Sequence, residues 1–275
     1  MKSRSICEIS PRLLLVREVI FFTPCREKKA LIAMLALLTS AAAALVSTSA
    51  LRDVSKTLSL AFSGCNYAER LMVGRKAQLG DAMVYTSTSN IDTALTYGEF
   101  DHQLFAAFVD RALDGRPDGS TFVDVGSGCG RLVLAAAVLW PQLGRCAGVE
   151  CVPELHELAQ HAAAKAVLPS SSPRCEFVLG KAEEALAVDG PLASADVIFA
   201  YSTAFAADWE YLTDFSVLCG THLRVGTRVV TTDRMLCDVE GQWRFELLER
   251  LEGVNRETGG SSVGYVFEVA QSLRG

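Results

Sequence analysis

The chain has 275 residues, of which 50% are hydrophobic and 21% are charged, so it can bury one substantial core and carry a short appendage. The first 50 residues have a charge balance of +4, from seven Lys or Arg and three Glu, and because the total is −6 the remainder carries −10. Broad electrostatic binding of nucleic acid needs clustered basic residues, so this acidic body argues against that class of protein and leaves room only for a local basic patch.

Nine cysteines and four histidines indicate neither a metal site nor a disulfide framework. The cysteines are odd in number, scattered, and never form a C-x-x-C pair, so we interpret them as small apolar residues in a reducing compartment. His156 and His161 are five positions apart on an expected helix, which places them on different faces. We therefore predict no metal site.

Residues 26–50 have the order of a secretory signal: a basic cluster, an apolar run from Ala30 to Val46, and small residues ending at Ala50. The apolar run is interrupted by two hydroxyl residues and is at the lower limit of length for crossing a bilayer. We therefore predict a cleaved targeting segment over residues 1–50 and no stable membrane span in the processed protein.

The next stretch, LRDVSKTLSLAFSGCNYAERLMVGRKAQ (51–78), is rich in Ser, Lys and Arg and poor in acids, as organelle transit segments are. Together with the preceding segment it favours import into a plastid-like organelle, which also suits reduced cysteines. The alternative is an amphipathic N-terminal helix in a nuclear or cytoplasmic protein.

From about residue 121 onward, strand-like and helix-like segments alternate, and a further helix is expected before the first strand. The expected strands are 121–126, 145–150, 175–180, 195–202, 227–233, 243–252 and 262–270, and the expected helices are 98–113, 129–140, 152–167 and 208–219. Short β-branched runs separated by helices imply parallel pairing through right-handed crossovers, so we predict an α/β fold with a doubly wound, mostly parallel seven-stranded sheet. Only a loop at 253–261 separates the last two strands, so they should form a terminal antiparallel hairpin.

A glycine turn follows the first expected strand, in the stretch TFVDVGSGCGRLVLAAAVLW (121–140). Gly126, Gly128 and Gly130 alternate there, with Asp124 two residues ahead, and glycines allow the backbone to approach a ligand closely. A dinucleotide fingerprint would need its third glycine at Arg131, so this pattern differs from it. Ligands of such sheets bind at the carboxyl ends of the strands, where this turn lies.

Glu150 ends the second expected strand, 20 residues after Gly130. A carboxylate at that position can accept hydrogen bonds from both hydroxyls of a ribose. The pattern therefore predicts a ligand that contains a ribose, with little support for a pyrophosphate.

These features resemble class I S-adenosylmethionine-dependent methyltransferases over about residues 95–270. The resemblance implies a Rossmann-like fold with S-adenosylmethionine as cofactor and a methyltransferase domain over 96–275. By position, Asp124 and the turn Gly126–Gly130, including Ser127 and Gly128, would line the methionine part, and Glu150 would hold the ribose. The segment LGKAEEAL places Lys181 and Ala182 where the family has its adenine contacts.

The upstream stretch VYTSTSNIDTALTYGEF (84–100), with its Tyr97-Gly98-Glu99, is similar to the DOT-type (non-SET) histone-lysine methyltransferases. In that family a Y-G-E segment precedes the glycine turn, and the loop before it closes over the cofactor. The resemblance implies that Glu99 contacts the methionine end, that Tyr85 belongs to the lid, and that 51–95 form an N-terminal extension and lid.

Two further segments resemble the same family. ADVIFAYSTAF (195–205) is similar to its fourth strand, and SVGYVFEVA (262–270) places Tyr265 near an aromatic of the lysine channel. The chain departs from the family at Tyr201-Ser202, where the histone enzymes have an Asn pair. It also has Lys181-Ala182 in place of an acid and an aromatic, and it lacks the basic tract that binds nucleosomal DNA.

The methyl group of a sulfonium is already activated, so the enzyme mainly aligns a nucleophile with it and excludes water. A lysine amine must arrive neutral, which an apolar channel favours because it penalises the ammonium. Four residues are the candidates for that channel: Tyr201, Ser202, Phe205 and Tyr265. The sequence shows no general base, which favours a nitrogen acceptor over an oxygen acceptor.

The leading prediction is a methyltransferase, acting on nitrogen, whose substrate is a protein lysine, with histones as one candidate. The alternatives are a small-molecule methyltransferase in an organelle and a non-catalytic, methyltransferase-like binding module.

Overall fold

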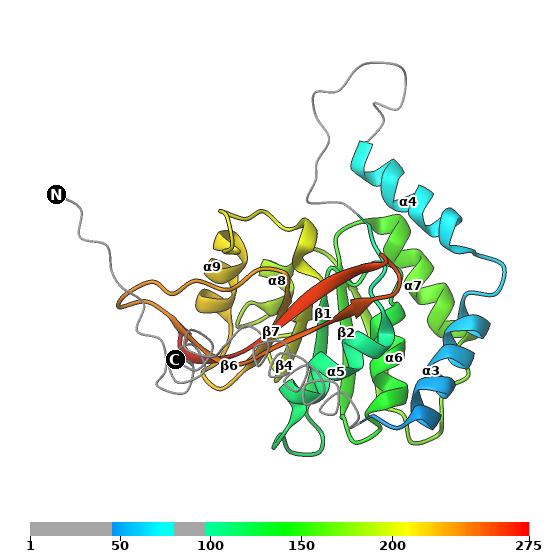
Figure 1. Ribbon diagram of the computed structural model, residues 1–275, viewed down its shortest axis with the longest axis horizontal. Coiled ribbons are helices and arrows are strands. Elements are labelled where there is room, and N and C mark those ends of the chain that lie inside the picture. Colours follow the sequence, from blue (N-terminus) through cyan, green and yellow to red (C-terminus); the bar gives the residue numbers. More distant parts are fainter. Residues whose placement is uncertain (1–45, 80–96, 275) are drawn as a thin grey trace, which may run out of the picture. The chain divides into compact units, whose positions relative to one another are not determined.

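The computed structural model describes residues 46–79 and 97–274 (Figure 1). The predicted targeting segment therefore lies outside the described residues except for its last five positions. The predicted lid, including Tyr85, lies outside them from residue 80 to its end.

A seven-stranded sheet forms the centre of the fold (Figure 1). The strands are β1 (Thr121–Val125), β2 (Arg145–Glu150), β3 (Arg174–Leu179), β4 (Val197–Ala200), β5 (Arg228–Thr232), β6 (Arg244–Asn255) and β7 (Gly260–Gln271). Their order is β3-β2-β1-β4-β5-β7-β6, with β1 to β5 parallel and β7 antiparallel to both β5 and β6. The predicted doubly wound sheet with a terminal antiparallel hairpin is confirmed.

The central strands β1 and β4 are buried along their whole length because helices cover both faces of the sheet. Every residue of β1 and of β4 is buried, as expected for parallel strands with no solvent-facing side. The edge strand β6 instead exposes much of its length, and its pairing with β7 shifts register between Leu247 and Glu249. A bulge of this kind twists an edge strand and limits its pairing with other chains.

Helices cover the sheet in two groups. One core includes side chains of α5 (His102–Leu113) and α6 (Arg131–Leu139), with a contribution from α7 (Pro153–Lys165). The second core includes side chains of α8 (Ala182–Leu186) and α9 (Thr213–His222). The alternating strands and helices therefore bury two apolar layers, one on each face of the sheet.

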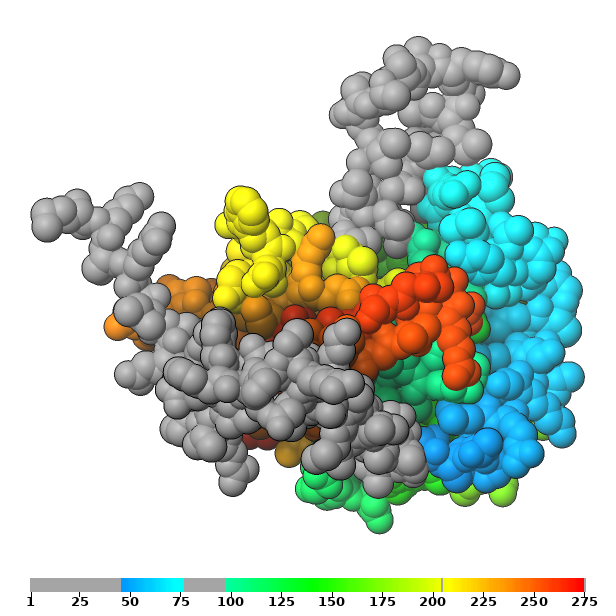
Figure 2. All heavy atoms as spheres, in the orientation of Figure 1, coloured from blue at the N-terminus to red at the C-terminus, as the bar shows by residue number. Residues whose placement is uncertain are grey.

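Two helices precede α5: α3 (Thr48–Ala61) and α4 (Tyr67–Leu79). The leading prediction of a targeting segment did not include them, whereas its alternative was an amphipathic N-terminal helix. The Ser47 side chain caps α3 by accepting a hydrogen bond from the Ala50 N–H at 3.1 Å. Val54, fully buried, anchors α3 in the core it shares with α6. In Figure 2, α3 and α4 form a continuous blue and cyan surface along one side of the molecule. The small residues that suggested a cleavage site are thus the first turn of α3, and cleavage there stays a prediction.

The predicted helices begin later than expected, for local reasons. The helix expected from residue 98 begins after Asp101, whose carboxylate accepts from the N–H groups of Gln103 and Leu104. Residues 97–101 stay irregular and run to the end of the sheet that carries the glycine turn. The helix expected from residue 208 begins at Thr213, because 208–211 form a tight turn.

None of the helices within residues 46–79 and 97–274 is both long and apolar enough to span a membrane. In the same ranges, no group of three or more His, Cys, Asp or Glu side chains is arranged to hold a metal ion.

Candidate cofactor and active site

A cavity of about 400 Å³ opens at the carboxyl ends of β1, β2 and β4. Nine of the predicted site residues line it: Glu99, Asp124, Gly126, Ser127, Gly128, Glu150, Lys181, Ala182 and Tyr201. Its volume lies within the range of small-molecule sites, which is roughly 300–1,000 Å³. Segments far apart in the sequence therefore meet at the place where an α/β sheet binds its ligands.

The glycine turn has the backbone conformation that only glycine adopts without strain. Gly126, Gly128 and Gly130 have φ angles of 73°, 53° and 81°. A Cβ on Gly128 would lie 2.7 Å from the Tyr97 ring, and one on Gly130 would lie 2.5 Å from the Phe177 ring. Gly130 does not line the cavity. Gly130 instead precedes α6 as its N-cap residue and lets the turn pack closely against Phe177 of β3, whereas Gly126 and Gly128 line the cavity.

Glu150 joins the two loops that frame the cavity. Its Oε2 accepts from the Gly128 N–H at 2.8 Å, and its Oε1 accepts from the Val152 N–H at 2.9 Å. A carboxylate has about four acceptor positions, so both oxygens keep capacity for a second donor. The predicted ribose contact is therefore available at a side chain that is already held in place.

Asp124 is almost fully buried, with 2% of its surface exposed. Burial, the main cause, and the nearby charge of Glu150, the second cause, together raise the pKa of this carboxyl to about 8. A buried acid with a raised pKa is favoured in its neutral form until a cation comes close. The cavity therefore contains a carboxyl that a ligand ammonium would bring back to its charged form.

Lys181 and Ala182 follow β3 and line the far side of the cavity, and Glu183 lies beside them. Glu183 therefore brings a carboxylate to this side of the cavity, one residue after the Lys181-Ala182 pair. Ser127 also lines the cavity, but its side chain packs over β2, since a Cβ on Gly148 would lie 2.5 Å from the Ser127 Oγ.

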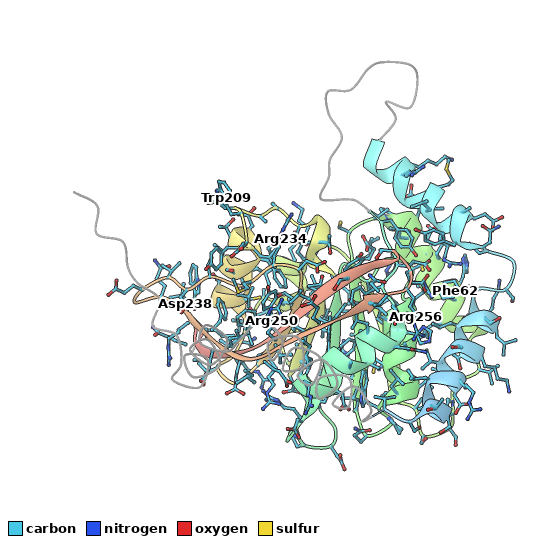
Figure 3. The ribbon with its side chains drawn as sticks, in the orientation of Figure 1. Phe62, Trp209, Arg234, Asp238, Arg250 and Arg256 are labelled. Atoms are coloured by element: carbon cyan, nitrogen blue, oxygen red, sulfur yellow. The ribbon has the colours of Figure 1, made fainter. Side chains whose placement is uncertain are left out.

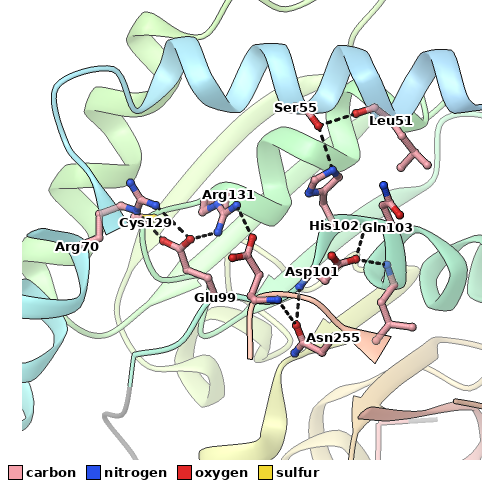
Figure 4. Close-up of polar contacts among 12 residues, drawn as sticks. Leu51, Ser55, Arg70, Glu99, Asp101, His102, Gln103, Cys129, Arg131 and Asn255 are labelled. Atoms are coloured by element: carbon pink, nitrogen blue, oxygen red, sulfur yellow. Dashed lines mark hydrogen bonds and ion pairs between the residues drawn. The ribbon is translucent and has the colours of Figure 1, made fainter. Parts of the chain in front are cut away.

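Glu99 lies at the centre of an ion-pair cluster that the sequence did not reveal (Figure 4). Only 6% of its surface is exposed, and its carboxylate pairs with Arg70 of α4 at 2.6 Å and with Arg131 of α6. The Tyr97 hydroxyl donates to the same carboxylate at 2.8 Å. The predicted cofactor residue therefore also attaches α4 to α6 and to the segment before α5.

Tyr97 and Cys129 face each other across the glycine turn, with 3.0 Å between the Tyr97 hydroxyl and the Cys129 Sγ. Burial raises the pKa of Tyr97 well above its ordinary value, and Cys129 raises it further. Burial likewise raises the pKa of the Cys129 thiol to about 11. Both groups stay protonated at neutral pH, so neither serves as a base in the free protein.

Tyr201 is the one predicted catalytic residue that lines the cavity. Its ring centroid lies 4.9 Å from that of Phe100, and burial is the main cause of its raised pKa. The ring of Phe205 reaches the glycine turn, 3.7 Å from where a Cβ on Gly126 would be. Tyr201 and Phe205 therefore form an aromatic wall beside the turn, and they are two of the four residues considered for the acceptor channel.

Ser202 and Tyr265 lie elsewhere. Ser202 is fully buried, and its hydroxyl donates to the Thr232 carbonyl at 2.9 Å and accepts from the Thr232 N–H at 3.0 Å, which joins the end of β4 to β5. Tyr265 lies on β7 opposite Thr231 and packs against Phe267, with the core that contains α8 and α9. Neither lines the cavity, so their catalytic roles stay predictions that this placement does not support.

Helix α9 adds a wall that sequence reasoning missed, made by Asp214, Phe215 and Leu218. Phe215 packs edge-on against Phe205, with ring centroids 5.4 Å apart. The expected helix over 208–219 was the only signal for it, because no motif linked these residues to a ligand.

The sheet order, the glycine turn, the acid at the end of β2 and the cavity between them define a class I S-adenosylmethionine-dependent methyltransferase. Residues 82–242, more than half of the chain, match the protein family described as histone methylation protein DOT1. The chain belongs to this family, as the Y-G-E segment and the turn predicted. No curated protein sequence matched it.

Solved structures with a similar fold include three methyltransferases. The rRNA methyltransferase AviRa of Streptomyces viridochromogenes is 16% identical, with a TM-score of 0.45 over 72% of this chain and 94% of that one. An S-adenosylmethionine-dependent methyltransferase of Clostridium acetobutylicum is 12% identical, with a TM-score of 0.44 over 62% and 92%. The M1A22 tRNA methyltransferase TrmK of Bacillus subtilis is 18% identical, with a TM-score of 0.40 over 60% and 66%.

Proposed function

We propose that this protein transfers the methyl group of S-adenosylmethionine to the side-chain nitrogen of a lysine in a protein substrate, with histones as one candidate. The observation that carries the proposal is the family match, which spans Tyr97-Gly98-Glu99, the glycine turn and the segment after β4. These three segments line the same cavity.

The residues present fit the cofactor along the order of the strands. Lys181, Ala182 and Glu183, which line the cavity after β3, would contact the adenine, and Glu150 at the end of β2 would contact the ribose. The glycine turn after β1 and Asp124, near the end of β1, would contact the methionine part. Bound there, the cofactor would supply a methyl group that is activated by its sulfonium.

The aromatic wall suits an amine acceptor. Phe100, Tyr201 and Phe205 would surround the incoming nitrogen with apolar surface, which lowers the pKa of a lysine amine and favours its neutral, nucleophilic form. They would also hold it in line and exclude water. A neutral amine needs no protein base, which agrees with the protonated state of Tyr97 and Cys129.

An exposed aromatic turn beside the cavity favours a protein over a small molecule as substrate. Trp209 is 91% exposed, follows cavity-lining Ala206 by three residues, and projects from the molecule in Figure 3. Reciprocal backbone hydrogen bonds between Asp208 and Tyr211, at 2.9 and 3.0 Å, hold the turn. Exposed Trp and Tyr are typical of protein interfaces, and a tryptophan face attracts a cationic side chain.

The test is a titration of the full chain with S-adenosylmethionine, followed by transfer of a labelled methyl group to nucleosomes, free histones and a cell extract. We expect binding, and label on lysine when the products are analysed by mass spectrometry. Label confined to a small-molecule fraction would replace the lysine proposal with a metabolite, and binding without any transfer would select a non-catalytic module.

Trp209→Ala tests the substrate surface. We expect it to raise the KM for the protein substrate about 10-fold, the size of a modest interface contact, without changing the affinity for S-adenosylmethionine. Val225→Ala removes an exposed side chain outside the residues that line the cavity and is the control. An unchanged KM for Trp209→Ala would remove the turn from the proposal.

The proposed location is a plastid-like organelle, reached through the N-terminal segment. A fluorescent fusion to residues 1–60 should leave the cytosol. A uniform nuclear signal from the full chain would contradict import and favour a histone substrate.

A further inference from the structure

Two residues other than glycine have a positive φ angle among those that the structure describes: Trp209 at 58° and Asp233 at 62°. This left-handed conformation is uncommon for such residues, and residues held in it are concentrated at functional sites. Backbone hydrogen bonds join their segments, because the Met235 N–H donates to the Glu210 carbonyl at 2.8 Å and the Leu212 N–H donates to the Met235 carbonyl at 2.8 Å. Both unusual residues therefore belong to one part of the surface.

Asp233 lies at the edge of the cavity, beside Tyr201. It directly follows β5, which pairs with β4, and Tyr201 directly follows β4. The Thr203 hydroxyl donates to Oδ2 of Asp233 at 2.9 Å. Burial is the main cause of the raised pKa of Tyr201, the Thr203 hydroxyl lowers that pKa, and the charge of Asp233 raises it. The carboxylate is therefore close to the hydroxyl end of a side chain that lines the cavity.

The Asp233 carboxylate is held in place without a cation. The Asp233 N–H donates to the Val263 carbonyl at 2.7 Å, and its Oδ1 accepts from the Val263 N–H at 2.9 Å. The neighbouring Arg234 instead donates to the Phe205 carbonyl at 2.9 Å. Across residues 46–79 and 97–274, no Lys, Arg or His forms an ion pair with Asp233, which is exposed. Each of its oxygens accepts one hydrogen bond and keeps capacity for a second donor.

The surface changes from charged to apolar between Asp233 and the cavity. Tyr201 packs against Phe100, with ring centroids 4.9 Å apart, and both rings belong to the wall proposed for the acceptor. A carboxylate at the outer end favours a protonated amine through charge-assisted hydrogen bonds, whereas the apolar surface further in favours the neutral amine. We propose that Asp233 binds the ammonium group of the substrate at the entrance of the cavity and so selects a cationic acceptor; this rests on the proposed function. Asp233 is then a substrate-binding residue, and Thr203 is a positioning residue that orients its carboxylate.

The test uses n-butylammonium, which reproduces the end of a lysine side chain, and 1-butanol, its uncharged counterpart of similar size. Each is titrated into the full chain, with and without S-adenosylhomocysteine, and binding is followed by NMR of the probe. We expect the wild-type protein to bind n-butylammonium about 10-fold more tightly than 1-butanol, and Asp233→Asn to lose most of this preference. The variant should keep the fold, because asparagine tolerates the left-handed conformation and its amide oxygen can still accept from the Val263 N–H.

Asp238→Asn is the matched control, because Asp238 is also exposed, accepts the Phe245 N–H at 2.8 Å and does not line the cavity (Figure 3). It should keep the preference for n-butylammonium. Equal binding of the two probes by the wild-type protein would overturn the proposal, as would a preference that Asp233→Asn leaves unchanged or that both variants weaken equally.

The labelled methyl-transfer assay separates this proposal from the proposed function. If lysine is methylated with the same KM by the wild-type protein and Asp233→Asn, the proposed function stands and the ammonium subsite is wrong. If the preference for n-butylammonium depends on Asp233 but no amine is methylated, the cation site is confirmed and the proposed function is wrong.

Discussion

The half of the cavity proposed for the cofactor and the half proposed for the acceptor differ in how directly the sequence determines them. In the first half, the turn after β1 and Glu150 at the end of β2 are brought together because β1 and β2 are adjacent parallel strands. In the second half, Tyr201 faces the cavity but its neighbour Ser202 faces β5. Strand ends thus place a cofactor contact by topology, whereas an acceptor contact depends on which way one side chain turns.

The largest expected effect is a loss of stability when the backbone of the glycine turn is altered. Gly128→Ala should lower the free energy of unfolding by about 2–4 kcal/mol, because the left-handed conformation and the clash with the Tyr97 ring add together. Chemical denaturation measures the change. Gly241→Ala, with φ of 76° and open space around it, carries the strain without the clash and should cost less. Equal costs at the two positions would mean that the Tyr97 ring does not cover the turn.

The next effect concerns the ribose contact. Glu150→Gln should weaken binding of S-adenosylmethionine by about 1–3 kcal/mol, the usual range for a lost hydrogen bond to a charged group. Calorimetric titration measures it, with Glu157→Gln on the exposed side of α7 as control. Unchanged affinity in the Glu150 variant would refute the assignment of the ribose to the end of β2.

The third effect is a pH dependence carried by Asp124. The folded chain keeps a proton on this carboxyl up to pH of about 8, whereas the unfolded chain releases it near its ordinary pKa of 3.8. The free energy of unfolding without cofactor should therefore decrease as pH rises through this window, by at most about 1.4 kcal/mol per pH unit. Asp124→Asn should remove that slope and weaken cofactor binding. Chemical denaturation at several pH values measures this dependence, with a substitution of an exposed acid, Asp118→Asn, as the control. If Asp124→Asn keeps the same dependence, groups other than Asp124 cause it.

The smallest expected effect tests whether Ser202, beside the half of the cavity proposed for the acceptor, has a structural role. Ser202→Ala should lower the free energy of unfolding by about 1 kcal/mol, through the hydrogen bonds with Thr232, and leave methyl transfer unchanged. Thermal unfolding and a methyl-transfer assay measure the two, beside Ser261→Ala on the surface. If Ser202→Ala loses methyl transfer without losing stability, Ser202 has a catalytic role.

The sequence predicted the fold because each strand and crossover helix carries its own local pattern, and parallel pairing follows from their alternation. Nine of the residues that it predicted for the site line one cavity, since they lie at or just after the ends of strands or belong to one irregular segment before α5. The sequence could not connect Arg70 with Glu99, which are 29 residues apart and linked by no motif. In the sequence, Arg131 was noted only because it occupies the position where a dinucleotide fingerprint has its third glycine. Its ion-pair partners, Glu99 and Glu257, are distant in sequence, and only the fold brings their segments next to α6.

The attachment of α3 and α4 decides where the chain can be shortened. A fragment that begins at residue 97 would expose the α6 surface on which Val54 and Leu58 pack, and such apolar surface promotes aggregation. It would also leave Glu99 without Arg70. A minimal fragment for expression and crystallisation should therefore begin at or before Ser47, the residue that caps α3.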